Sequence, residues 1–260
     1  MTVAVTAAFG GVRRFIETSG TIALLGGRAA VRAVRRPFGL DELIRQLESI
    51  GIRSISVVVL TAIFSSMVMT VQFAVQLARF GSKEYVGNVV SLSLIRELGP
   101  VLTALMVGGR VGAGITAELG SMSVTEQIDA MRSMGADPVK ELVVPRVLAA
   151  AIALPLLTVL ANVLGVAGAM VVARLEAGVN MTYFFHAVLR AIDVSDLMGG
   201  LIKTVFFGTM IALIACYKGM NTRGGTEGVG RATTETVVIT SITTLVADFV
   251  LTKILLELGL

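Results

Sequence analysis

The sequence predicts an all-α integral membrane protein, in which an N-terminal interfacial amphipathic helix precedes five transmembrane helices, and a short cytoplasmic helix joins the second and third spans. Hydrophobic residues make up 55% of the 260-residue chain and charged residues only 15%, whereas a soluble domain carries about 25% charged residues. The mean hydropathy is +0.85. Most of the surface is therefore expected to face lipid rather than water.

Residues 1–50 are expected to form a basic helical segment on the inner side of the membrane. Arginines stand beside apolar residues here, and a proline ends the run: Arg28, Arg32, Arg35 and Arg36 accompany Ile22, Leu24, Leu25 and Val31, before Pro37. Such a helix would lie in the headgroup layer with its arginines on anionic lipid. An ordinary basic cytoplasmic tail is the alternative. Because Arg13 and Arg14 follow the weakly apolar start of the chain, we expect no secretory signal.

Residues 51–260 are expected to form one membrane domain of five spans. Its apolar tracts cover about 54–78, 86–111, 147–173, 197–217 and 236–256. Each tract can cross a hydrocarbon layer of about 30 Å as a helix. An odd number of spans places the two termini on opposite sides of the membrane.

The Lys and Arg residues outside the spans choose the orientation, because cytoplasmic segments are enriched in them. With the N-terminus inside, the inner segments hold fifteen and the outer segments hold four, namely Arg79, Lys83, Arg174 and Arg190. The sequence therefore predicts a cytoplasmic N-terminus and a C-terminus on the outer side.

A polar segment between spans two and three is expected to contain a short cytoplasmic helix over about 123–134. Ser123 and Glu126 have the spacing of a capping box, and Gly135 with Asp137-Pro138 is typical of a helix end. A helix joined rigidly to two spans can act as a mechanical handle. A loop that merely closes a hairpin is the alternative.

Four tracts in this region and a fifth before the last span resemble the MlaE/YrbE family of ABC transporter permeases, the membrane subunits of the Mla and Mce lipid transport systems. The tracts are Ser93–Leu105 (SLIRELGPVLTAL), Gly109–Gly120 (GRVGAGITAELG), Thr125–Met131 (TEQIDAM), Asp137–Arg146 (DPVKELVVPR) and Gly228–Val238 (GVGRATTETVV). The resemblance covers essentially the whole chain beyond the N-terminal helix.

The resemblance implies a permease in the bacterial inner membrane that moves phospholipid and maintains envelope lipid asymmetry. The implied partners are a second copy of the chain, two cytoplasmic ABC ATPase subunits, a STAS-domain protein and a periplasmic MCE-domain lipid carrier. Helix 123–134 would be the coupling helix that docks into an ATPase groove. Its implied contact residues are Ser123, Thr125, Glu126, Gln127, Asp129, Ala130 and Arg132.

Five ionisable residues fall inside the predicted spans: Arg96, Glu97, Lys203, Asp248 and Lys253. Each costs roughly 2.5–3.5 kcal/mol on insertion scales, so an intramembrane charge is a candidate functional group. All five lie toward the outer leaflet in the predicted topology. Adjacent helical residues point about 100° apart, so Arg96 and Glu97 are expected to have different partners.

We expect Arg96 and Glu97 to bind substrate, with an interhelical ion pair as the alternative role. A lipid also needs an apolar wall, and span one offers a helically spaced stripe of Met69, Phe73, Gln76, Leu77 and Phe80. Helix packing is the alternative role of this stripe. For Lys203 and Lys253 we expect snorkelling to the outer headgroups. The glycines Gly108, Gly112, Gly165 and Gly168 are typical of close helix packing, within the chain or at a dimer contact.

The chain is expected to bind no cofactor, metal or nucleic acid. Residues 219–226 have the glycine spacing of a P-loop, but Gly225 stands where the phosphate-binding lysine is required. ATP and Mg are therefore expected on a partner ATPase, and this chain is expected not to be an enzyme. Two alternatives are a lipid-modifying enzyme using Glu97, Asp248 and His186, and an ion-coupled secondary transporter. The latter typically has an inverted repeat, which we do not find.

Overall fold

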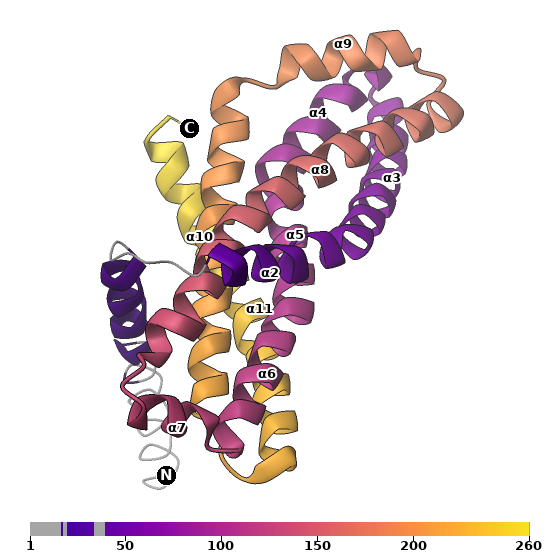
Figure 1. Ribbon diagram of the computed structural model, residues 1–260. Coiled ribbons are helices and arrows are strands. Elements are labelled where there is room, and N and C mark those ends of the chain that lie inside the picture. Colours follow the sequence, from indigo (N-terminus) through magenta and orange to yellow (C-terminus); the bar gives the residue numbers. More distant parts are fainter. Residues whose placement is uncertain (1–16, 18–19, 34–39, 260) are drawn as a thin grey trace, which may run out of the picture.

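A computed structural model describes residues 17, 20–33 and 40–259 of the chain, and all the regular secondary structure in these residues is helical (Figure 1). The sequence-based predictions for Arg13, Arg14, Arg35, Arg36 and Pro37 lie outside the described residues. Five helical segments of the described part are long and apolar enough to cross a membrane. The predicted number of spans is therefore confirmed.

The first two spans are interrupted helices. The first consists of α2 (Leu40–Ile50), the 3-10 helix η1 (Ile52–Ser54) and α3 (Ile55–Arg79). The second consists of the 3-10 helix η2 (Lys83–Tyr85), α4 (Val86–Ser93), the π-helix η3 (Leu94–Leu98), α5 (Gly99–Val107), the π-helix η4 (Gly108–Gly112) and α6 (Ala113–Val124). These π-helical turns widen the helix where its charged and glycine-rich tracts lie.

The remaining spans are more regular. The short helix α7 (Gln127–Ser133) leads into the π-helix η5 (Val139–Val143) and α8 (Val144–Glu176), which stays helical through Pro155. Helix α9 (Met181–Ala191) connects α8 to α10 (Val194–Met220), and α11 (Gly225–Glu257) ends the chain.

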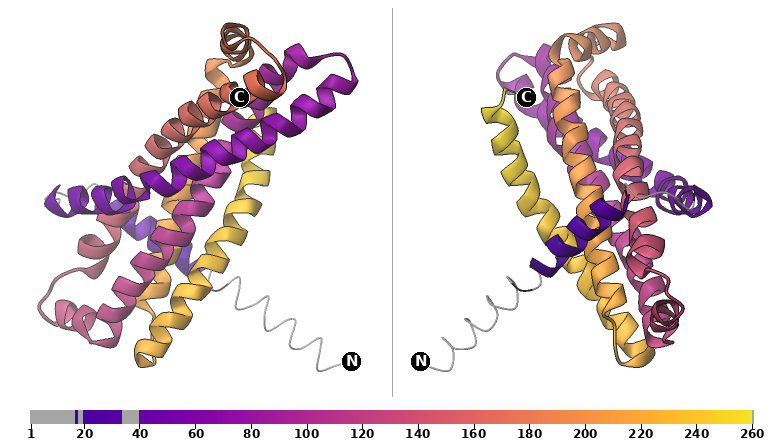
Figure 2. Two further views of the ribbon diagram at one scale, coloured as in Figure 1. Left: turned by 90° about the vertical axis from the view of Figure 1, so that its right-hand side faces the viewer. Right: turned by 60° about the vertical axis from the view of Figure 1, so that its left-hand side comes forward.

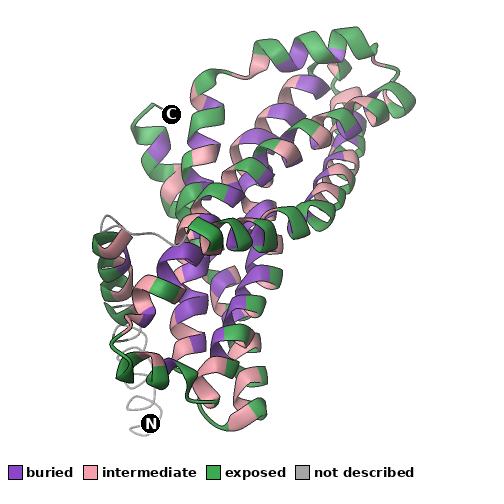
Figure 3. Ribbon diagram, in the orientation of Figure 1, coloured by how far each residue is buried: buried purple, intermediate pink, exposed green. Residues whose placement is uncertain are grey.

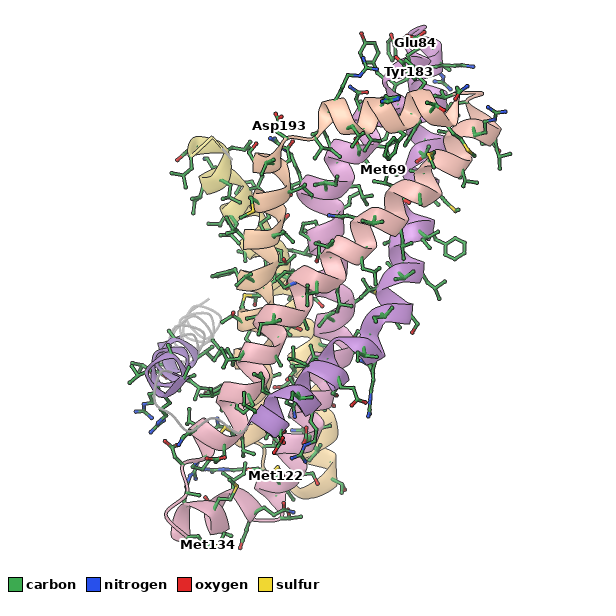
Figure 4. The ribbon with its side chains drawn as sticks, turned by 45° about the horizontal axis from the view of Figure 1, so that its top comes forward. Met69, Glu84, Met122, Met134, Tyr183 and Asp193 are labelled. Carbon is green, nitrogen blue, oxygen red and sulfur yellow. The ribbon has the colours of Figure 1, made fainter. Side chains whose placement is uncertain are left out.

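The two connecting helices mark opposite ends of the molecule, which we call the α7 end and the α9 end (Figure 1). Helix α9 runs across its end of the bundle, above α4 and α8. Figure 4 places Met122 and Met134 at the α7 end and Glu84, Tyr183 and Asp193 at the α9 end. Helix α11 runs along one side of the bundle (Figure 2). Only 11% of its most apolar window is buried, so one long side of α11 has no neighbour among the residues that the structure describes.

The buried core follows α8, α10 and the helices of span two, whereas α3 and α9 expose one side each (Figure 3). Small residues let these helices approach closely. A Cβ on Gly208 of α10 would lie 2.5 Å from the backbone oxygen of Ala150 in α8, so only glycine fits there.

The four glycines predicted from the sequence also pack inside the protomer. Gly108 and Gly112 face Ile211 and Thr240, and Gly165 and Gly168 face residues of α3 and η3. Their surfaces are therefore occupied by helices of the same chain, and the alternative that they form a dimer contact is wrong.

Residues 20–33 form a helix that packs against the α7 half of the bundle. Ala29 is buried in the core, and a Cβ on Gly26 would lie 3.1 Å from the Leu213 side chain of α10. Leu24 and Val31 are exposed. The helix thus has an apolar side free for lipid, and its place in the headgroup layer stays a prediction.

Candidate functional site

The π-helix η3 carries Arg96 and Glu97 and is shaped by the residues that follow it. A Cβ on Gly99 would overlap the side chain of Asn162 in α8, so glycine is required for this approach. Pro100 has no N–H and cannot donate to the carbonyl of Arg96 four residues earlier. That carbonyl instead accepts a hydrogen bond from Lys203 Nζ of α10 at 3.2 Å. The backbone itself therefore helps to bind the lysine.

Lys203 is the centre of the site, because its ammonium group on α10 is surrounded by oxygen atoms from two other spans. Its Nζ donates to Glu97 Oε2 at 2.7 Å and to Thr252 Oγ1 of α11 at 2.7 Å, in addition to the Arg96 carbonyl. These bonds use all three donors of the lysine. Asp248 Oδ1 lies 3.3 Å away and adds a second carboxylate.

The predicted snorkelling of Lys203 is wrong, because its side chain is only 3% exposed and reaches no membrane surface. Lys203 is buried because it lies on the face of α10 that meets η3 and α11. The hydropathy of the sequence does not show which face of a span meets other helices. Lys253 is exposed on α11, and its snorkelling stays a prediction.

Arg96 has a different partner from Glu97, as its helical position predicts. Its Nε and one terminal nitrogen both contact Asp196 Oδ1 near the start of α10. Asp196 is held in place by a capping box, in which the Asp193 N–H donates to Asp196 Oδ2 at 2.9 Å. The Asp196 side chain is 3% exposed and the Arg96 side chain is 41% exposed. Arg96 is thus anchored on one side and accessible on the other.

Sequence reasoning missed Asp196 and Thr252 as members of the site. Asp196 lies just before the apolar tract 197–217 that predicts span four, so the tract does not include it. The signal that could have found it is the spacing Asp193-x-x-Asp196, which is typical of a helix start. Thr252 carries no charge and gives no comparable signal.

These groups line a cavity of about 110 Å³ that opens between η3, α10 and α11. It contains two cations and two of the three carboxyl groups of the cluster. Its lining residues are Arg96, Glu97, Asp196, Gly199, Gly200, Lys203, Thr252, Leu255 and Leu256. The cavity combines charged groups with an apolar rim, which is the chemistry that a lipid headgroup and the start of its acyl chains require.

The predicted stripe on span one is not part of this cavity. Phe73 and Leu77 pack against a core cluster that includes Val86, Val90 and Phe184. Met69 is half-buried and Gln76 is exposed on α3, and Phe80 is exposed just after the end of this helix. A contact between this stripe and substrate therefore stays a prediction. His186 is exposed on α9 and does not line the cavity either, so the three groups of the enzyme alternative are not brought together.

At the α7 end, the predicted helix over 123–134 is shorter than expected. Ser123 still belongs to α6, and its hydroxyl donates to the carbonyls of Met220 and Thr222 at 3.2 Å each. Glu126 adopts a left-handed backbone conformation with φ +60°, and α7 begins only after it. The predicted capping box is therefore wrong, because both of its residues serve a tight turn between α6 and α7.

The predicted contact residues nevertheless gather on the surface at this end. Ile128 is buried and holds α7 to the bundle. The exposed residues are Thr125, Glu126, Gln127, Asp129, Ala130 and Arg132, and Asp129 pairs with Arg132 at 2.7 Å. Six of the seven predicted positions are thus free to meet another protein.

Ion pairs join the elements that flank α7 in the chain. Arg146 near the start of α8 is 2% exposed and contacts Glu118 of α6 at 2.8 Å. Its other terminal nitrogen donates to the carbonyl of Leu142 at 2.7 Å. Asp137 contacts Arg32 of helix 20–33 at 2.5 Å. These contacts tie the segments on both sides of α7 to each other and to helix 20–33.

The comparison with known proteins identifies the family. Residues 43–254 match the family described as Permease MlaE. The chain belongs to the MlaE permease family. It is 36% identical over 237 residues to the intermembrane phospholipid transport system permease protein MlaE of Haemophilus influenzae, covering 91% of this chain and 90% of that protein.

Other relatives of this MlaE family member come from distant organisms. A probable ABC transporter permease protein of Rickettsia typhi is 40% identical over 244 residues, covering 94% of each chain. The chloroplastic protein trigalactosyldiacylglycerol 1 of Arabidopsis thaliana is 35% identical over 240 residues, covering 92% of this chain and 69% of its own length. Family membership shows an ABC permease and indicates a transporter subunit rather than an enzyme.

Proposed function

We propose that this MlaE permease moves phospholipid between the bacterial inner membrane and a periplasmic MCE-domain carrier, and so maintains envelope lipid asymmetry. The observation that carries the proposal is the buried Lys203, held with three carboxyl groups and Arg96 inside otherwise apolar spans. Charged groups are costly to insert into a membrane, so a cluster of them inside the spans is a candidate functional site. The half-exposed Arg96 offers a cation to a lipid phosphate, and the rim of Leu255 and Leu256 offers apolar contact.

The transporter is proposed to contain two copies of this chain. The cavity of about 110 Å³ admits part of a headgroup only, so the acyl chains must lie outside it. Helix α11 borders the cavity and leaves a long apolar side uncovered. A second copy on this side would enclose the lipid between two protomers.

The driving force is proposed to come from two cytoplasmic ABC ATPase subunits that bind ATP and Mg and contact α7. The exposed residues of α7 and the ion pair between α6 and α8, the helices on its two sides, support this assignment. Closure of the ATPases would displace α7 and rearrange the protomers. A STAS-domain protein is proposed as a further cytoplasmic partner. In this arrangement the α7 end and the N-terminus are cytoplasmic, and the α9 end and the C-terminus are periplasmic.

The test is reconstitution of the chain in phospholipid vesicles, with and without the ATPase subunits that copurify with it from native membranes. We expect labelled phospholipid to move only when the ATPase subunits and ATP are both present. Mass spectrometry of the copurified chains should find the ATPase, STAS and MCE proteins. Turnover of lipid by the purified chain alone would contradict the proposal and favour the lipid-modifying enzyme.

A further inference from the structure

Helix α9 has three different sides along its eleven residues. Phe184, Ala187 and Val188 are buried against the bundle. Met181, Phe185 and Leu189 follow one another at intervals of four residues and are 40%, 51% and 59% exposed. Thr182, His186 and Arg190 form a third, polar side that is also exposed. At about 100° per residue, the exposed apolar side lies between the buried side and the polar side.

This order of sides matches the surroundings at the edge of a bilayer. A helix at the rim of a bundle that lies along the membrane surface meets protein on one side, acyl chains on the second and water on the third. Figure 1 shows α9 running across the end of the bundle, at a large angle to α10. A helix that projected into water would have no reason to expose Phe185 beside Met181 and Leu189.

Two features favour lipid over a protein partner as the occupant of the apolar side. The exposed apolar surface continues onto the start of α10 through Val194, Leu197 and Met198, and α10 is itself a membrane span. The neighbouring polar side carries Arg190 and His186, whose nitrogens can meet lipid phosphates while the apolar side reaches the acyl chains.

We propose that α9 is an interfacial anchor, in which Met181, Phe185 and Leu189 enter the acyl region of the adjacent leaflet while Thr182, His186 and Arg190 face headgroups and water. The anchor fixes the level of the bilayer at the α9 end. Ile192 and Asp193 connect α9 directly to the first turn of α10, which contains Asp196. The anchor therefore also fixes how deep the ion pair between Arg96 and Asp196 lies in the membrane. The inference does not depend on which side of the membrane the α9 end faces.

The experiment places single cysteines at Phe185 and Leu189 on the apolar side and at Thr182 and His186 on the polar side. The native Cys216 is fully buried, and labelling of the unchanged protein measures its background. Each variant carries an environment-sensitive fluorophore and is reconstituted, in the complete transporter, in phosphatidylethanolamine and phosphatidylglycerol vesicles with or without brominated acyl chains. Phe64→Cys on the exposed side of α3 serves as a reference inside the membrane.

We expect labels at 185 and 189 to emit at shorter wavelength than labels at 182 and 186, and to lose fluorescence to brominated acyl chains as the Phe64→Cys label does. An apolar side inserted by about 5–10 Å gives this pattern. Water-like emission at all four positions would overturn the proposal. Short-wavelength emission at 185 and 189 without quenching by brominated lipid would also overturn it, because a protein partner would then cover this side.

Discussion

Lys203 is the residue on which the charged site depends. It is 3% exposed and bonds groups from η3 and α11, so it joins three spans at one point. Buried ion pairs contribute little net stability compared with apolar packing, but removing one partner leaves an uncompensated charge. The positive charge of the lysine therefore compensates the carboxylates around it. We expect removal of the lysine to lower the free energy of unfolding by more than the loss of one hydrogen bond would.

Lys203→Met is expected to lower the free energy of unfolding by about 3–5 kcal/mol, because Glu97 and Asp248 then face each other without a cation. The measurement is unfolding of the purified protein in mixed detergent micelles. Lys253→Met is the matched control, since Lys253 is an exposed lysine of the same region, and it should leave stability unchanged. Equal effects of the two substitutions would show that the cluster is not a structural centre.

At this scale the sequence predicts which residues are unusual but not which residues they meet. Arg96 and Glu97 were expected to have separate partners because adjacent helical residues diverge, and they do. Lys203 was expected at the headgroups because an isolated lysine in a span can snorkel. Its burial depends on how α10 is rotated about its axis relative to η3 and α11. This rotation is set by the packing of the helices and cannot be read from the sequence.

Among the elements, α7 depends on the helices at its two ends. The pair Glu118–Arg146 joins α6 to α8, the two long helices between which α7 lies in the chain. Arg146 is 2% exposed, and one of its two terminal nitrogens contacts the Glu118 carboxylate while the other donates to the carbonyl of Leu142. If the pair makes α7 and its flanking helices one rigid unit, weakening it should allow α7 to move without moving the spans.

Glu118→Gln and Arg146→Gln, singly and together, form a double-mutant cycle for this unit. We expect a coupling energy of about 0.5–3 kcal/mol between the two positions, as for other directly bonded side chains. In the reconstituted transporter, each single variant should hydrolyse more ATP per lipid moved than the unchanged protein. Independent effects of the two substitutions, with normal coupling, would remove the ion pair from the account.

The turn at Glu126 provides a second prediction for α7. A left-handed conformation at a residue other than glycine costs of order 1–3 kcal/mol, and Glu126 has φ +60°. Glu126→Gly should therefore keep the turn and increase stability, while Glu126→Val should distort the turn, since a branched side chain is disfavoured there.

Unfolding measurements and ATP-driven transport rates of the two Glu126 variants distinguish the role of the backbone conformation from the role of the side-chain charge. Transport that survives Glu126→Gly but fails in Glu126→Val shows that the shape of the turn matters. Loss of transport in Glu126→Gly would instead show that the carboxylate itself meets the ATPase. Normal transport in both variants would exclude this turn from coupling.

The existence of α7 could be predicted from a polar stretch in an apolar chain, but its start could not. Ser123 and Glu126 have capping-box spacing, yet the Ser123 hydroxyl bonds carbonyls of Met220 and Thr222, 97 and 99 residues further along the chain. A local pattern was thus overridden by a tertiary contact. The five spans can be predicted from the sequence because their signal is the length of each predominantly apolar tract, which packing does not alter.

For the whole molecule, the distribution of Lys and Arg predicts which end faces the cytoplasm. The α7 end carries the connections with many basic residues, and the α9 end carries few. Met134→Cys at the α7 end and Leu258→Cys at the α9 end are exposed positions, at 78% and 69%. In intact cells with permeabilised outer membranes, we expect an impermeant maleimide to label Leu258→Cys and to label Met134→Cys only after the inner membrane is opened. The reverse pattern would invert the topology and remove α7 from the ATPase.

The central claim is that the cavity between η3, α10 and α11 binds the headgroup of the transported lipid, while the energy for transport comes from a separate ATPase. The most direct measurement is ATP-driven movement of labelled phospholipid by the complete transporter carrying Leu256→Trp, which places a larger side chain at the cavity rim, compared with Leu156→Trp on the exposed side of α8. Leu256 and Leu156 are 59% and 65% exposed, and of the two only Leu256 lines the cavity. The account predicts that Leu256→Trp loses transport but retains ATP hydrolysis, and that Leu156→Trp loses neither. Normal transport by the Leu256→Trp transporter would contradict it.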